Sequence, residues 1–257
     1  MGWTKEELKQ LHKNMFKFGW THGIEQPEKE VLIIKPIINT DIKDKAFPSD
    51  FPLIKGRHGV LNEFWHKFFT SSNISVILGG RGQGKSTLGF RILEDVRART
   101  GKLCYALGFP NVQLPDYIIK VDDMQQVMGN SFVLIDEAGI AFNSKATFND
   151  KSKYLADMLK TARHDNISVV CITQNSASLD VNIIRLTDTM FFKKPSMLQK
   201  FFERAPMKKI FLEAVEYLSE AKGKEEVYIM DDLFTGMVKA SLPTFWNNEI
   251  STAYKKG

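Results

Sequence analysis

Residues 74–87 read ISVILGGRGQGKST, an apolar run followed by a glycine-rich turn. Residues 79–86 match the pattern G-x-x-x-x-G-K-[ST], for which a chance match in a chain of 257 residues is on the order of one in a hundred. The pattern requires a strand before it and a helix after it, and the flanking sequences predict both. Glycines let backbone N–H groups converge on an anion, and the helix N-terminus adds partial positive charge. We therefore expect a phosphate-binding loop, with a glycine-rich turn that binds nothing as the alternative.

Each position of this loop has an expected role. Lys85 is expected to reach the outer phosphates of a nucleotide, and the Ser86 hydroxyl is expected to bind Mg²⁺. The expected cofactors are therefore ATP and Mg²⁺. The predicted nucleotide contacts are Gly79, Gly80, Arg81, Gly82, Gln83, Gly84, Lys85, Ser86 and Thr87.

A second motif, FVLIDEAG at residues 132–139, is an apolar strand that ends in two carboxylates. Asp136 is expected to hold Mg²⁺ through water, and Glu137 is expected to polarise an attacking water as general base. An acceptor hydroxyl of a small molecule needs no such activation, so the second acid favours hydrolysis over transfer. Taken alone, the pattern also suits a solvated strand end.

A third strand, ISVVCIT at residues 167–173, is followed by Gln174 and Asn175. If this strand lies between the loop strand and the acidic strand, Gln174 points at the γ-phosphate and can sense it or position the water. The alternative is a polar strand cap without a catalytic role.

Short apolar strands alternate with amphipathic helices from Ser72 onward, which predicts an α/β fold with a mostly parallel sheet flanked by helices. We predict a helix at 4–18, an extended arm over 25–60 and a helix at 61–70, as an N-terminal region of residues 1–71. The core, residues 72–195, has predicted strands at 74–78, 102–107, 117–121, 132–136, 167–173 and 189–193, with helices including 85–99 and 150–163. A C-terminal extension, 196–257, has predicted helices at 196–204 and 208–221, a hairpin of 226–230 and 237–242, and a last short helix.

Composition excludes collagen, coiled coil and wholesale disorder, because 43% of the residues are hydrophobic and no repeat is visible. The net charge of +5 permits a polyanionic partner, and without a basic tail any nucleic-acid surface must be assembled by folding. Apolar runs far shorter than about 20 residues and a charged N-terminus predict no membrane span and an intracellular protein. Cys104 and Cys171 each lie in an apolar run, which predicts buried thiols.

Taken together, the motifs GGRGQGKST, LIDEAG and VVCITQN, with Arg163-His164 before the third and Leu179-Asp180 and Ile184-Arg185 after it, resemble the FtsK–HerA superfamily of DNA-pumping ATPases. Viral genome-packaging ATPases and Zot-like phage morphogenesis proteins are the most similar branch. The resemblance spans roughly residues 72–195. It implies a RecA-like P-loop NTPase core, a homo-oligomeric ring of five or six subunits, ATP hydrolysis between neighbours and double-stranded DNA in the channel. It also suggests a capsid or portal vertex as a partner, and a location in the host cytoplasm or on the virion.

Ring ATPases of this kind complete each site with an arginine from the next subunit. Arg163 matches the family position best, with Arg185 and Arg204 as further candidates, and a surface ion pair is the alternative. His164 is expected to serve packing or hydrogen bonding.

The DNA contacts are expected from a polar loop at 141–153 that carries Lys145, Lys151 and Lys153. The doublets Lys193-Lys194 and Lys208-Lys209 are further expected exposed cations. The aromatic residues of 64–69 are expected to pack in the core or at a subunit contact.

Four functions remain open on these grounds. The preferred one is a motor that hydrolyses ATP and translocates double-stranded DNA into a viral capsid. A Zot-like assembly or secretion ATPase that acts on protein is the second. A small-molecule kinase is disfavoured because Asp136, Glu137 and Gln174 suit water as the nucleophile. The fourth is a non-hydrolysing nucleotide switch.

Overall fold

The computed structural model describes residues 45–109, 112–136, 158–173, 181–196, 205–247 and 250. All of these belong to one compact unit, Asn39–Gly257. The helix predicted at 4–18, the helix at 196–204 and the lysine loop at 141–153 lie outside the described residues.

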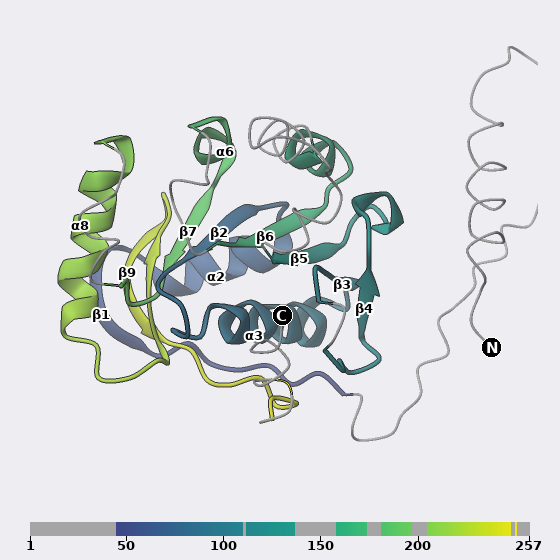
Figure 1. Ribbon diagram of the computed structural model, residues 1–257, viewed down its shortest axis with the longest axis horizontal. Coiled ribbons are helices and arrows are strands. Elements are labelled where there is room, and N and C mark those ends of the chain that lie inside the picture. The colour runs from purple at the N-terminus through teal and green to yellow at the C-terminus, as the bar shows by residue number, and fades with distance from the viewer. Residues whose placement is uncertain are drawn as a thin grey trace, which may run out of the picture. The chain divides into compact units, whose positions relative to one another are not determined.

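The described residues form a nine-stranded sheet in the order β1-β9-β8-β7-β2-β6-β5-β3-β4 (Figure 1). Its parallel part runs from β7 to β4. The strands of this part are β2 (Ile74–Leu78), β3 (Cys104–Leu107), β4 (Ile118–Val121), β5 (Phe132–Asp136), β6 (Ser168–Ile172) and β7 (Thr189–Phe192). The predicted α/β fold with a mostly parallel sheet is confirmed, and β2 and β5 have the predicted bounds.

Three further strands extend the sheet beyond β7 in antiparallel fashion. They are β8 (Glu226–Met230), β9 (Phe234–Lys239) and β1 (Leu53–Gly59). The prediction placed the second hairpin strand at 237–242, because Thr235 and Gly236 resemble turn residues. In the structure the turn is shorter: the Asp231 carboxylate accepts the Leu233 N–H at 2.9 Å, and the strand starts at Phe234.

Helices cover both faces of the sheet. The helices α2 (Leu61–Thr70) and α3 (Lys85–Thr100) contribute to a hydrophobic cluster with Ile77 and Leu134. The second cluster, on the other face, contains Val76 and Leu78 and joins α8 (Ala205–Ser219) and the helical residues 158–164 to the sheet. Neighbouring residues of β2 thus point into different clusters, as alternation along a strand requires. The buried strands read as continuous apolar runs because both faces are covered.

Short elements complete the description. They are the 3₁₀ turn η2 (Met124–Gln126) and the helix α6 (Val181–Leu186). No helix in the described part of the chain has the length and apolar character needed to cross a bilayer.

The aromatic residues of 64–69 and the two cysteines pack in the core, as predicted. Phe64, Phe68 and Phe69 are buried, and Trp65 stacks on Phe51 with ring centroids 4.1 Å apart. Cys104 and Cys171 are buried, and burial raises the pKa of each thiol to about 12. Neither thiol is therefore ionised near neutral pH.

A buried charge network on α3 was not predicted. Arg91, Glu94 and Asp95 are almost fully buried, and the Arg91 guanidinium pairs with Glu94 at 3.0 Å and with Asp95 at 2.7 Å. The two carboxylates also accept backbone N–H groups: Phe47 at 3.2 Å and Thr244 at 2.9 Å bind Glu94, and Ser49 at 2.7 Å binds Asp95. Two segments remote in sequence, 45–51 and 241–247, are thereby fixed to α3.

Candidate nucleotide-binding site

The predicted phosphate loop connects β2 to α3, as its sequence pattern requires. Gly79, Gly82 and Gly84 have φ angles of 150°, 72° and 80°. A residue with a Cβ rarely adopts these angles, so the glycines give the loop its path. Gly84 is the N-cap of α3.

The N-terminus of α3 suits an anion. No side chain caps it, and its first turn contains no acidic residue. The first N–H groups of a helix have no partner within the helix and carry its positive dipole end. This arrangement matches the donor set that a chain of phosphates requires.

Lys85 lies at the same place, with its side chain buried beside the loop. Its ammonium donates hydrogen bonds to the carbonyl oxygens of Gly79 and Gly80, both at 2.9 Å. Arg81 and Gly82 are exposed, whereas Gln83, Ser86 and Thr87 are half-buried. The structure thus brings all nine predicted contact residues into one loop and helix start.

The loop rests against the residues that follow β7. Lys193 N–H donates to Leu78 O at 2.7 Å, and Gly80 N–H donates to Lys194 O at 3.0 Å. A Cβ on Gly79 would lie only 2.7 Å from the Lys193 Cβ and 2.9 Å from its carbonyl oxygen. Glycine at 79 is therefore required by this contact as well as by its φ angle.

Lys193 itself was wrongly predicted to be exposed. Its side chain is only 3% exposed, while Lys194 is exposed as predicted. The reason is that Lys193 directly follows β7, a strand between β2 and β8, and its side chain packs between the loop and the residues at the start of β8. It follows the run TMFF directly, and the pairing of this strand with the loop strand is seen only in the structure.

The ends of β2, β6 and β5 meet at one edge of the sheet. Ile77 of β2 pairs with Ile172 of β6, which pairs with Asp136 of β5. The Thr173 N–H donates to Ile77 O at 3.1 Å, which extends this alignment by one residue. The strand before Gln174 thus lies between the loop strand and the acidic strand, the condition set for its predicted role.

Ser86 and Asp136 are the described residues that could hold Mg²⁺. Hydroxyl and carboxylate oxygens are the ligands that this cation takes beside phosphate oxygens. Asp136 is half-buried at the end of β5, on the edge of the sheet where the phosphate loop begins. Glu137 and Gln174 directly follow the described parts of β5 and β6 and lie outside the described residues.

The arginine candidates lie elsewhere. Arg163 donates to the Asp188 carboxylate at 2.6 Å and to Leu186 O at 3.2 Å. Asp188 in turn accepts the N–H of Ile74, the first residue of β2, so this pair lies at the opposite edge of the sheet from the phosphate loop. Arg185 is exposed on α6, and Arg204 lies outside the described residues. His164 is exposed and contacts Asp165.

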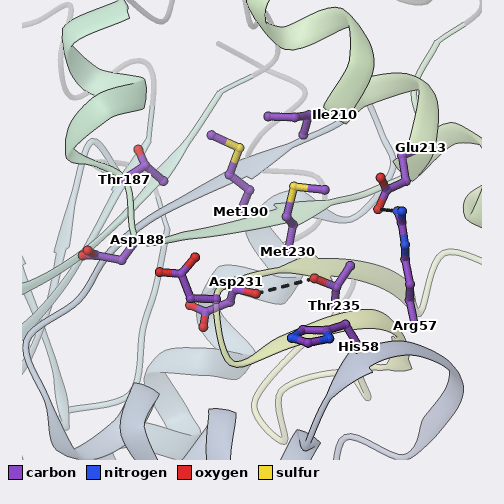
Figure 2. A pocket seen from close by; sticks show the side chains of 11 residues that line it. Arg57, His58, Thr187, Asp188, Met190, Ile210, Glu213, Met230, Asp231 and Thr235 are labelled. Atoms are coloured by element: carbon purple, nitrogen blue, oxygen red, sulfur yellow. Dashed lines mark hydrogen bonds and ion pairs between the residues drawn. The ribbon is translucent and has the colours of Figure 1, made fainter.

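A separate pocket of about 730 Å³ opens at that opposite edge (Figure 2). Its carboxylates are Asp188, Glu213, Asp231 and Asp232, against the single guanidinium of Arg57, which pairs with Glu213. Figure 2 shows Met190 and Met230 between this ion pair and Asp188. The excess of negative charge makes this pocket unsuitable for a triphosphate.

The family model described as zonular occludens toxin (Zot) matches residues 91–196. No curated protein sequence matches the chain. The solved structures that resemble it include B204, the DNA-packaging ATPase of Sulfolobus turreted icosahedral virus, with 18% identity, a TM-score of 0.47 and coverage of 66% of this chain and 98% of that one.

Two further structures are similar. EssC (ATPases 2 and 3) from Geobacillus thermodenitrificans has 13% identity and a TM-score of 0.48, covering 84% of this chain and 50% of that one. The N-terminal domain of zonular occludens toxin from Neisseria meningitidis has 14% identity and a TM-score of 0.37, covering 72% and 98%. The predicted resemblance to Zot-like proteins is confirmed by the family match over residues 91–196, which starts in α3, just after the phosphate loop.

Proposed function

We propose that this protein is an ATP-hydrolysing motor that translocates double-stranded DNA, with viral genome packaging as its setting. The observation that carries the proposal is the meeting of three strand ends, those of β2, β6 and β5, beside an uncapped helix start. This arrangement places a phosphate loop, an acidic strand and a polar strand end at one edge of the sheet. The proposal that the substrate is DNA rests on the order of the three motifs and on their family resemblance.

The described residues divide the work as follows. Lys85 and the N-terminus of α3 bind the phosphates and stabilise the charge that develops on them during hydrolysis. Ser86 and Asp136 would hold Mg²⁺, which supplies positive charge to the phosphate oxygens when bound. Glu137 is proposed to accept a proton from the attacking water, and Gln174 to orient that water.

We also propose a ring of five or six subunits in which Arg163 of one subunit completes the site of the next. The lysines of residues 141–153 follow the acidic strand and would grip DNA phosphates without regard to sequence. A capsid or portal vertex would receive the DNA, and the protein would act in the host cytoplasm or on the virion.

Purified protein tests the motor directly. ATP turnover should rise when duplex DNA is added, and Glu137→Gln should abolish turnover while leaving nucleotide binding intact. Glu216→Gln, an exposed acid on α8, is the matched control and should behave as wild type. Turnover that ignores duplex DNA and survives Glu137→Gln would remove the proposal.

A Zot-like assembly or secretion ATPase that acts on protein is the second candidate, favoured by the Zot match to residues 91–196. The two candidates differ in their salt dependence. A DNA motor should lose DNA affinity steeply with salt, because each phosphate contact releases counterions. An ATPase that binds DNA weakly, with a shallow salt slope, would instead act on protein.

A further inference from the structure

A second buried lysine lies beneath the phosphate loop. The stem of Lys193 runs along the loop: a Cβ on Gly79 would be 2.7 Å from its Cβ, and a Cβ on Gly84 would be 3.7 Å from its Cε. Gly79 begins the loop, and Gly84 ends it at the N-cap of α3. The Lys193 ammonium therefore lies under the end of the loop where the helix starts.

The ammonium of Lys193 is held by main-chain oxygens of the segment that leads into β8. It donates to Lys224 O at 2.6 Å and to Glu226 O at 3.1 Å. Lys224 O also lies 3.4 Å from the position of a Cβ on Gly84. Lys193 thus connects three parts of the chain, namely the phosphate loop, the end of β7 and the start of β8.

The carboxylates nearest to Lys193 are engaged with other groups. The Glu226 side chain accepts the N–H groups of Lys222 at 3.2 Å and Gly223 at 2.7 Å. Glu225 pairs with Lys239 at 3.0 Å. These two acids attract the Lys193 charge from a distance. Of the cations on the adjoining segments, Lys85 is buried, whereas Arg81, Lys194 and Lys224 are exposed.

A charged lysine in this place disfavours folding. Burial lowers the pKa of Lys193 to about 8, with Glu226 and Glu225 opposing the shift. Below about pH 8 the side chain is charged in both the folded and the unfolded chain, so the desolvation penalty is present in full. Between about pH 8 and the ordinary value of 10.5, the folded chain loses the proton first and the penalty shrinks. A costly charge kept directly under an anion site points to a role in binding.

We propose that Lys193 is a positioning residue of the nucleotide site, which ties the phosphate loop to residues 224–226 and attracts the phosphates from beneath the loop. This inference rests on the proposed nucleotide site and assigns to it a second buried cation besides Lys85. A bound triphosphate would in turn favour the charged form of Lys193.

Titration with a fluorescent ATP analogue tests the proposal, at constant ionic strength between about pH 7 and about pH 9.5. The variants are Lys193→Met, which removes the charge, and Lys193→Arg, whose guanidinium stays charged throughout this pH range. Lys194→Met is the matched control, because Lys194 is the exposed neighbour. At about pH 7, Lys193→Met should bind about tenfold more weakly than wild type, and Lys194→Met within about twofold of it.

The pH profile separates a charge effect from a packing effect. Wild-type affinity should fall above about pH 8, Lys193→Met should show no such fall, and Lys193→Arg should hold its affinity across the range. The melting temperature of nucleotide-free Lys193→Met should stay close to that of wild type at about pH 7, because removal of the buried charge opposes the loss of the hydrogen bonds to Lys224 O and Glu226 O. If Lys193→Met fails to fold, Lys193→Gln, which keeps a donor for the two carbonyl groups, takes its place.

Three results would overturn the proposal. They are wild-type affinity in Lys193→Met, a fall above pH 8 that persists in that variant, and a lower melting temperature with an unchanged pH profile. The proposed nucleotide site fails separately, if wild type does not bind the analogue or if Lys85→Ala binds it equally well.

Discussion

Replacing Glu94 by glutamine should destabilise the fold strongly while leaving the nucleotide site intact. The Glu94 carboxylate is fully buried, pairs with Arg91 at 3.0 Å, and accepts the N–H groups of Phe47 and Thr244 at 3.2 and 2.9 Å. Glutamine keeps the shape but removes the charge, and its amide nitrogen meets donors where an acceptor is needed. The change therefore weakens an ion pair and the attachment of two chain segments together.

The size of the loss in unfolding free energy depends on the partners that Arg91 keeps. Breaking a buried ion pair by removing one partner costs about 3–5 kcal/mol, because the other charge is left buried. Arg91 keeps its contact with Asp95 at 2.7 Å, so we expect the lower end, about 3 kcal/mol. The free energy of unfolding of a natural domain is about 5–15 kcal/mol, so this loss is a large fraction of it.

Urea unfolding followed by circular dichroism measures this loss, with Glu216→Gln on the exposed face of α8 as the control. The control should lie within about 0.5 kcal/mol of wild type. In limited proteolysis, Glu94→Gln should be cut within 45–51 or 241–247 before the core is cut, since these segments depend on the network. A Glu94→Gln protein as stable as the control would refute the assignment of the network as a structural clamp.

Three further predictions concern the loop, the thiols and the arginine. Gly79→Ala should weaken nucleotide binding at least about tenfold, because it adds backbone strain and a close contact with Lys193. Gly101→Ala, at a φ of 68° with nothing within 4 Å of the added Cβ, adds strain alone and should bind nucleotide as wild type does. Equal nucleotide affinities of the two variants would contradict the packing argument. Cys104 and Cys171 have a pKa of about 12, so only about one in ten thousand of these thiols is ionised at about pH 8. Ellman's reagent should therefore react with them only after denaturation. Rapid reaction of the native protein would show that the thiols are accessible. Arg163→Ala should lower ATP turnover by on the order of a thousandfold. It should change the free energy of unfolding by less than about 1 kcal/mol, because the pair with Asp188 is exposed. Unchanged turnover would show that Arg163 forms the ion pair but takes no part in hydrolysis.

Most of the parallel sheet could be predicted from the sequence because its strands are short runs of mostly apolar residues. The runs ISVIL and FVLID were placed with the observed bounds, and the glycines around Lys85 identified the turn between β2 and α3. The order of these strands was not predictable from local sequence, because it depends on pairings between residues far apart, such as Asp136 with Ile172.

The wrong prediction for Lys193 and the unpredicted network of Arg91, Glu94 and Asp95 have a common physical cause. All four are charged residues, which single-sequence reasoning assigns to the surface. Each is buried because neighbouring segments supply hydrogen-bonding partners: carbonyl oxygens of 224 and 226 for Lys193, and N–H groups of 47, 49 and 244 for the carboxylates. Such partners come from segments more than 30 residues away, and no local pattern reveals them.

The most direct test of the nucleotide site compares ATP hydrolysis by wild type and Lys85→Ala, with Lys67→Ala, exposed on α2, as the control. Wild type and the control should hydrolyse ATP at equal rates. Lys85→Ala should be slower by about 100-fold or more, because it loses the cation held over the loop carbonyl groups. Hydrolysis by Lys85→Ala at the wild-type rate would contradict the assignment of this loop as the site of reaction.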